Sequence, residues 1–190
     1  MSPELHINLA NLKSNIKFFQ RIIKTNTELS AVVKSDAYGL GITKIVPEIE
    51  KYGVRSFFTA TISEAIKVRR YSRASEIFTL NGFDFMKSNL YREHNITPII
   101  NNILEAQKFI EVFNQTQKVA IQLNTGMNRL GLDKQSLLEN IDLIKSLPLN
   151  LILSHLACAD DTSNKENKAQ KDLFIKLCKF FPNIRRSISA

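Results

Sequence analysis

The hydrophobic pattern of the chain alternates between two kinds of segment. Short runs of β-branched and aromatic residues fit buried strands, and longer segments with apolar residues about every three or four positions fit amphipathic helices. The strand candidates lie near Val33, Phe58, Phe78, Ile99, Ile121, Leu151 and Ile188. Repeated strand and helix units with short connections predict parallel strands and right-handed crossovers, in either an open doubly wound sheet or a barrel.

The helices between these strands are predicted from apolar spacing and from their end residues. Asn11 precedes a helical pattern over residues 12–23, Gly53 ends one over 45–52, and Ser63 is expected to cap one over 63–70. Further helices are expected over 83–93, 103–113, 135–146 and 164–180. Residues 5–9 alternate between apolar and polar side chains, which predicts a half-exposed strand ahead of the first helix.

Length and composition limit the domain count. A chain of 190 residues can bury a sizeable core, but it is shorter than the roughly 250 residues of a complete (β/α)8 barrel. With 44% hydrophobic and 23% charged residues, the composition is that of an ordinary folded domain. No Gly/Ser-rich linker interrupts the chain, so we expect one domain over residues 1–190.

Charge and cysteine content narrow the classes of partner. The net charge of +8 raises nucleic acid as a partner, with residues 67–73 as the densest basic run, but the other positive charges are scattered over helical patterns. A solvated, lysine-rich surface is therefore preferred. No apolar run reaches a membrane span and the N-terminus lacks a secretory signal, so a cytoplasmic location is expected. Cys158 and Cys178 lack zinc-site spacing, which predicts reduced buried thiols and no metal site.

One lysine needs an explanation of its own. Lys34 follows the apolar run of residues 31–33 and precedes a loop with two glycines. A lysine beside a buried strand is costly unless its ammonium reaches a cavity, a partner or a covalent cofactor. Taken alone, Lys34 also fits a solvated surface lysine, and this alternative stays open.

Three motifs, each following a strand, resemble segments of alanine racemases. Residues 34–41, Lys-Ser-Asp-Ala-Tyr-Gly-Leu-Gly, resemble the motif whose lysine covalently holds pyridoxal phosphate. This resemblance implies that Lys34 is the attachment and catalytic lysine and that Tyr38 lies beside the cofactor phosphate. Residues 122–131 resemble the segment whose arginine orients the cofactor oxygen and the substrate carboxylate, and Arg129 matches that arginine.

The third motif and two departures complete the comparison with this family. Residues 153–161 resemble the segment whose histidine packs against the pyridine ring, and His155 matches it. Gln122 stands where the family often has a carbamylated lysine, and Asn124 stands in place of an aspartate. Neither amide carries a charge, so we expect the anion that would position Arg129 to be absent.

The resemblance covers nearly the whole chain and implies its fold class. That class is α/β, an incomplete (β/α)8 TIM-type barrel of the alanine racemase N-terminal type, with about seven barrel strands present over residues 1–190 and the C-terminal β domain absent. All three motifs fall at carboxyl ends of predicted strands, where barrel enzymes place their chemistry. The pattern of strands and the resemblance therefore agree on where the site lies.

The implied activity is pyridoxal phosphate-dependent interconversion of L-alanine and D-alanine, which supplies D-alanine for peptidoglycan. In this family the second base is a tyrosine from the partner subunit's C-terminal domain. We expect that domain to be missing and the chain alone to be impaired or inactive, so whether it is an enzyme stays open. The alternatives are a non-catalytic pyridoxal phosphate-binding protein, one half of a split enzyme, and a protein-interaction module. Expected partners are alanine and a homodimer mate or complementing polypeptide, without nucleic acid or membrane.

Overall fold

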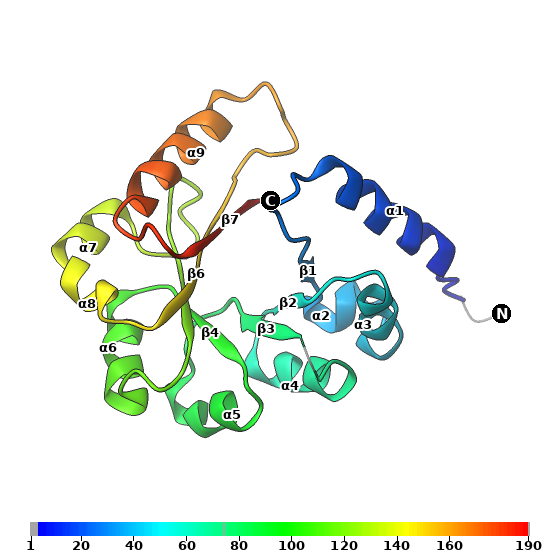
Figure 1. Ribbon diagram of the computed structural model, residues 1–190, viewed down its shortest axis with the longest axis horizontal. Helices are drawn as coiled ribbons and strands as arrows, with labels where there is room; N and C mark the ends of the chain where they lie inside the picture. Colours follow the sequence, from blue (N-terminus) through cyan, green and yellow to red (C-terminus); the bar gives the residue numbers. More distant parts are fainter. Residues whose placement is uncertain (1–3, 74, 190) are drawn as a thin grey trace. The chain divides into compact units, whose positions relative to one another are not determined.

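The computed structural model describes residues 4–73 and 75–189. Its contacts divide the chain into two units of α/β structure, in which helices and parallel strands alternate (Figure 1). The first unit comprises Met1–Leu80 with Glu93–Ile96, and the second comprises Asn81–Arg92 with Thr97–Ala190.

The first unit holds three parallel strands. Its elements are α1 (Leu9–Ile22), β1 (Ala31–Val32), α2 (Lys34–Tyr38), α3 (Ile42–Lys51), β2 (Ser56–Thr59), α4 (Ile62–Tyr71) and β3 (Glu76–Thr79). Strand β2 lies between β1 and β3, with Ala31 opposite Phe57 and Phe58 opposite Phe78. The rings of Phe58 and Phe78 stack with centroids 4.8 Å apart. Helix α4 packs against β2 and β3, and helix α3 packs against α4.

The second unit holds four parallel strands in chain order. Its elements are η1 (Phe85–Lys87), α5 (Ser88–Glu93), β4 (Thr97–Ile100), α6 (Ile103–Phe113), β5 (Val119–Gln122), α7 (Lys134–Glu139), α8 (Ile141–Lys145), β6 (Leu149–His155), α9 (Lys165–Cys178) and β7 (Arg185–Ser189). Each strand from β4 to β7 pairs with the next. Phe83 lies at the centre of an aromatic cluster, with ring centroids 5.4 to 5.5 Å from those of Tyr91, Phe109 and Phe113.

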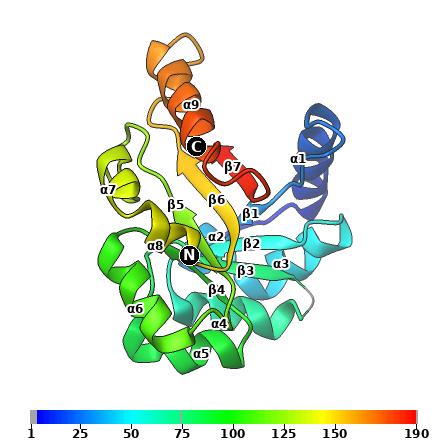
Figure 2. The same cartoon turned by 60° about the vertical axis from the view of Figure 1, so that its left-hand side comes forward.

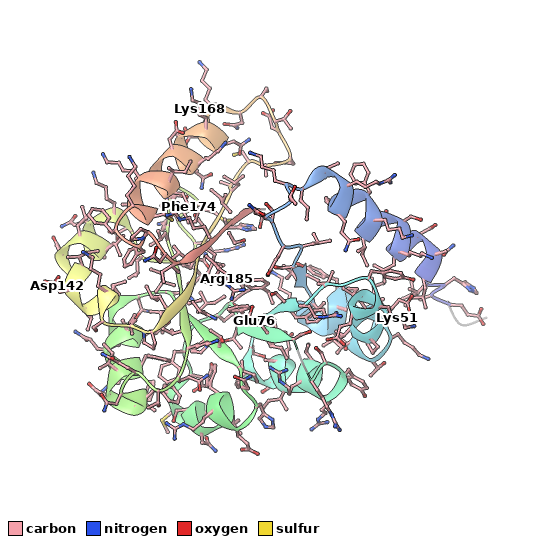
Figure 3. The ribbon with its side chains drawn as sticks, viewed as in Figure 1. Lys51, Glu76, Asp142, Lys168, Phe174 and Arg185 are labelled. Atoms are coloured by element: carbon pink, nitrogen blue, oxygen red, sulfur yellow. The ribbon has the colours of Figure 1, made fainter. Side chains whose placement is uncertain are left out.

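Helix α9 lies beside β6 and β7 in both ribbon views (Figure 1, Figure 2). Its apolar spacing places Phe174, Leu177 and Cys178 in the core, whereas Lys168 on the same helix projects into solvent (Figure 3). Cys158 is half-buried and Cys178 is buried, and both are free thiols. Of the two thiols expected to be buried, Cys178 is buried and Cys158 is only half-buried.

The strands follow the sequence prediction because burial dictates their composition. Every residue of β2, β4 and β5 is buried, as expected for parallel strands that are covered on both faces and read as continuous apolar runs. Helix α6 has the predicted bounds, and each strand lies at or next to the residue named for it. The prediction of seven strands is confirmed for the described part of the chain.

The strand predicted at residues 5–9 is wrong. Residues 5–8 are irregular, and α1 begins at Leu9, where Asn8 caps the helix by accepting hydrogen bonds from the amides of Ala10 and Asn11 at 2.9 and 3.2 Å. Leu5 is 70% exposed, so the alternation of apolar residues there reflects no buried face. The cap asparagine decides where the helix starts, in preference to the weak pattern of the residues before it.

Three other helix predictions need correction. Helix α3 begins at Ile42, three residues earlier than expected, because the Asp36 carboxylate accepts a hydrogen bond from the Ile42 amide. Helix α4 begins at Ile62 and is capped by Thr61 rather than Ser63. The helix predicted over residues 135–146 is two helices, α7 and α8, which meet at Asn140 with non-helical φ and ψ of −120° and 27°.

The basic run at residues 67–73 is partly structural rather than a free charged surface. The Arg69 guanidinium donates hydrogen bonds to five backbone carbonyls, those of Ser72, Arg73, Ser75, His94 and Asn95. These bonds join the end of α4 to the turn before β4. Arg69 therefore stabilises the first unit, contrary to the expectation of a uniformly solvated run.

Candidate functional site

Lys34 lies at the carboxyl end of β1, at the start of an unusual turn. The amide of Val33 extends the sheet ladder by donating to the carbonyl of Phe58 at 2.8 Å. Lys34 is half-buried, and the four residues after it, Ser35 to Tyr38, all have φ between 51° and 55°. Left-handed backbone costs about 1–2 kcal/mol per L-residue. Such a run persists only where surrounding contacts hold it, and it is typical of functional sites.

Hydrogen bonds within the left-handed turn, and one to a side chain of α4, hold its conformation. The Ser35 carbonyl accepts from the Gly39 amide and the Asp36 carbonyl from the Gly41 amide, both at 2.9 Å. Ala37 is buried. The carboxylate of Glu64, from the first turn of α4, accepts a hydrogen bond from the Ser35 amide at 2.8 Å.

The turn brings Lys34 and Tyr38 together. The Lys34 Nζ lies 5.9 Å from the centroid of the Tyr38 ring, and Tyr38 is 62% exposed. No ion pair involves Lys34 within residues 4–73 and 75–189. A primary amine and a phenolic hydroxyl on one rigid turn fit pyridoxal phosphate, because an amine condenses with its aldehyde and a hydroxyl donates to its phosphate.

Arg129 lies in the loop between β5 and α7, which is shaped by Asn124. The Asn124 Oδ1 accepts hydrogen bonds from the amides of Gly126 and Asn128 at 3.1 and 3.0 Å, and its Nδ2 donates to the Asn128 Oδ1 at 3.0 Å. At Gly131, with φ of 105°, a Cβ would lie 2.9 Å from the Gln122 carbonyl oxygen. The loop therefore requires glycine there.

The two neutral amides of this motif serve the loop rather than Arg129. Gln122 is buried at the end of β5, and its Nε2 donates to the Leu130 carbonyl at 3.4 Å. Arg129 is exposed and belongs to none of the ion pairs found among the described residues. A guanidinium without a carboxylate partner is free to bind an anion in a bidentate manner.

His155 is the last residue of β6 and is half-buried. Its carbonyl accepts a hydrogen bond from the Gln170 Nε2 of α9 at 3.1 Å. Gln170 is 1% exposed, and it also accepts from the Ala157 amide at 2.9 Å and donates to the Thr125 Oγ1 at 3.3 Å. One buried side chain therefore joins α9 to the loops that follow β5 and β6.

The predicted site residues fall into two pairs. Lys34 and Tyr38 belong to the first unit, and Arg129 and His155 belong to the second, where their loops follow the adjacent strands β5 and β6. A buried hydrogen bond of 2.7 Å between the hydroxyls of Thr125 and Ser154 joins the loop after β5 to strand β6. His155 ends its strand, and the other three residues lie in the segments that follow the carboxyl ends of β1 and β5.

Sequence reasoning missed two residues that hold these loops. The role of Glu64 could have been predicted, because Thr61-x-x-Glu64 is the pattern of a capping box. The structure contains both of its reciprocal hydrogen bonds. Gln170 had no such signal, since a glutamine on the apolar face of a helix has no single interpretation.

Two classes of feature are not found in the part of the chain that the structure describes. No helix there is long and apolar enough to cross a membrane. No cluster of three or more histidine, cysteine, aspartate or glutamate side chains there could hold a metal ion.

Comparison with known proteins adds an independent line of evidence. The profile of the family described as "Alanine racemase, N-terminal domain" matches residues 7–190. An alanine racemase of Rickettsia akari (strain Hartford) is 34% identical over 192 residues, covering 97% of this chain and 54% of the relative. An alanine racemase of Rickettsia prowazekii (strain Madrid E) is also 34% identical, with 97% and 47% covered. The chain thus spans about half the length of these relatives.

Solved structures of alanine racemases are also similar to this chain. The alanine racemase from Bartonella henselae with covalently bound pyridoxal phosphate is 31% identical, with a TM-score of 0.89 over 96% of this chain and 55% of that one. The biosynthetic alanine racemase from Pseudomonas aeruginosa is 26% identical, with a TM-score of 0.84 over 95% and 51%. The predicted fold class, α/β with seven strands of an incomplete (β/α)8 barrel, is confirmed.

Proposed function

The chain belongs to the family of alanine racemase N-terminal domains, and from this premise we propose that it carries the pyridoxal phosphate-binding half of an alanine racemase. The substrate is alanine, and the reaction is the interconversion of its L and D forms. The observation that carries the proposal is the strained left-handed turn at the end of β1, which presents Lys34 and Tyr38 together.

Lys34 is the proposed attachment and catalytic residue. Lys34 is half-buried and its backbone is fixed on both sides, since Val33 is part of the sheet ladder and the next four residues form the turn. A lysine amine needs such a base to attack the cofactor aldehyde repeatedly from one position. Pyridoxal phosphate, when bound, supplies the electron sink that makes the α-proton of an amino acid removable.

The other three residues have binding roles in this proposal. The Tyr38 hydroxyl is a hydrogen-bond donor for the cofactor phosphate. Arg129, which has no carboxylate partner among the described residues, binds the cofactor oxygen and the carboxylate of alanine. His155 packs its ring against the pyridine ring, and the hydrogen bond from Gln170 to its carbonyl supports that position.

The proposal is tested by mapping the lysine that the cofactor modifies. The purified 190-residue chain is mixed with pyridoxal phosphate and reduced with borohydride, and its peptides are analysed by mass spectrometry. We expect the pyridoxyl group on Lys34 and its loss in Lys34→Ala, because only Lys34 is presented by the turn. Lys44→Ala is the control, since Lys44 is an exposed lysine on α3 of the same unit. Labelling scattered over many lysines would contradict the proposal.

A second measurement separates a racemase from a non-catalytic carrier of the cofactor. The labelled chain is incubated with L-alanine in deuterated water, and exchange of the α-proton is followed by NMR. Exchange that depends on Lys34 supports the racemase. Specific labelling of Lys34 without any exchange of the α-proton supports the carrier.

A further inference from the structure

Two glutamates occupy equivalent positions in their helices, and each accepts hydrogen bonds from two successive loops. Glu64 is the third residue of α4, and Glu105 is the third residue of α6. Each accepts a hydrogen bond from the residue just before its helix cap, the amide of Ala60 at 2.8 Å and the amide of Asn101 at 2.9 Å. Each therefore holds the loop that follows its own strand.

Each glutamate also reaches the loop after the preceding strand. Glu64, which follows β2, accepts from the amide of Ser35 after β1 at 2.8 Å. Glu105, which follows β4, accepts from the amide of Phe83 after β3 at 3.3 Å. A Cβ at Gly82 would lie 2.5 Å from a Glu105 carboxylate oxygen, so the backbone there is shaped around that side chain. We call this arrangement, one carboxylate bonded to two successive loops, a loop clamp.

The two loop clamps hold loops of different importance. Glu105 holds a loop that contains none of the predicted site residues. Glu64 holds Ser35, the residue next to Lys34 and the first of the four with left-handed φ. The Ser35 amide precedes the hydrogen bonds formed inside the turn, so its partner must come from outside. Glu64 supplies this partner as a charge-assisted acceptor.

We propose that Glu64 is a positioning residue for Lys34, an inference that rests on the proposed function of Lys34. Its carboxylate acts through the Ser35 backbone and fixes the direction in which the turn presents the lysine. Glu64 touches neither cofactor nor substrate in this proposal. Its effect is to raise the fraction of molecules in which the Lys34 amine is positioned to react.

The test compares Glu64→Gln with Glu105→Gln in the full chain. In Glu64 one oxygen accepts from Ser35, and the other accepts from Ala60 and Thr61. Glutamine has nearly the same shape but replaces one oxygen with an NH2 group, so a donor must face a donor on one side. Glu105→Gln also replaces a carboxylate with an amide, at the clamp that holds no site residue. There one oxygen, Oε2, accepts from both Phe83 and Asn101, and the other accepts from the Asn102 Nδ2. If Glu64→Gln does not fold, Glu64→Asp replaces it, because the shorter carboxylate cannot span both loops.

Two readouts are measured well below the unfolding temperature of each variant. The first is the rate of borohydride-trapped pyridoxyl labelling at Lys34 relative to the other lysines. The second is amide hydrogen exchange at Ser35, which needs no cofactor. For Glu64→Gln we expect about tenfold slower labelling at Lys34 and about tenfold faster exchange at Ser35, because the hydrogen bond to a charged acceptor is lost. For Glu105→Gln we expect neither change.

The outcomes separate this inference from the proposed function. Unchanged labelling and exchange in Glu64→Gln would overturn the inference, and so would equal changes in both variants, since these would indicate a general loss of stability. If the unmodified chain forms no adduct at Lys34, the proposed function fails. Exchange at Ser35 then still decides whether Glu64 holds the turn.

Discussion

At the scale of single residues, Gln170 shows how much one buried polar side chain can hold. It is 1% exposed and makes three hydrogen bonds to two loops, and these loops carry Arg129 and His155. A buried polar group is tolerated only when its partners are present, and its removal leaves those partners unsatisfied. Gln170 is therefore part of the site's support, although it contacts no expected ligand.

We predict that Gln170→Ala lowers the free energy of unfolding by about 2–4 kcal/mol, because it leaves the Ala157 amide and the His155 carbonyl without this partner. Urea unfolding followed by circular dichroism measures the change. Gln135→Ala is the control, since Gln135 is an exposed residue of α7 whose side chain donates to Glu139 four positions on. We expect it to change stability by less than about 0.5 kcal/mol. Equal losses in the two variants would refute this role of Gln170.

At the scale of elements, helix starts are set by hydrogen-bonding side chains more than by apolar periodicity. Thr61 caps α4 by accepting from the Glu64 amide at 3.3 Å, and the Glu64 carboxylate accepts a hydrogen bond from the Thr61 amide. Ser63, the residue expected to cap this helix, is exposed within its first turn. Both residues are chemically able to cap, and only the backbone conformation decides between them.

This difference gives a prediction for α4. Thr61→Ala should lower the free energy of unfolding by about 1 kcal/mol, the usual cost of losing an N-cap. Ser63→Ala should change it by less than about 0.5 kcal/mol, because a surface position without a cap bond contributes little. Thermal unfolding of the two variants under the same conditions measures both. A larger loss of stability in Ser63→Ala than in Thr61→Ala would indicate that Ser63 caps the helix.

Sequence predicts the strands well and the turn at Lys34 poorly, for physical reasons. Strands β4 and β5 are buried on both faces, so their composition alone reveals them. The left-handed turn is built from serine, aspartate, alanine and tyrosine, none of which has an intrinsic preference for four such residues in a row. Its conformation depends on Glu64, which lies 29 positions away. Local patterns and the family resemblance single out Lys34 as a candidate site residue but carry no information about the geometry that presents it.

At the scale of the whole molecule, the chain contains two units with parallel strands, and the family comparison supplies the fold class. The expectation of one barrel domain over residues 1–190 stays a prediction. The same holds for the homodimer, the complementing polypeptide and the cytoplasmic location. Stability as a function of pH is a property of the whole chain that the structure does address, through Glu105.

Burial raises the pKa of Glu105 above its ordinary value of 4.5, although hydrogen bonds from Asn101, Phe83 and Asn102 partly offset this. The folded chain therefore binds more protons than the unfolded chain between the two pKa values. The contribution of Glu105 to stability is then greatest below the ordinary pKa and falls as pH rises through the raised pKa. We expect unfolding free energies from about pH 4 to about pH 7 to show this decline in the unmodified chain relative to Glu105→Gln. A parallel pH dependence in both would contradict it.

The loop clamps also bear on how the chain is completed during its synthesis. The acceptor for the Ser35 amide is encoded 29 positions downstream, that for Phe83 lies 22 positions downstream, and Gln170 follows Thr125 by 45. A ribosome releases these segments in order from the N-terminus. The turn that holds Lys34 therefore cannot reach its final form until the next strand and the start of its helix have left the exit tunnel. The loops that contain Phe83 and Thr125 depend in the same way on residues that are synthesised later.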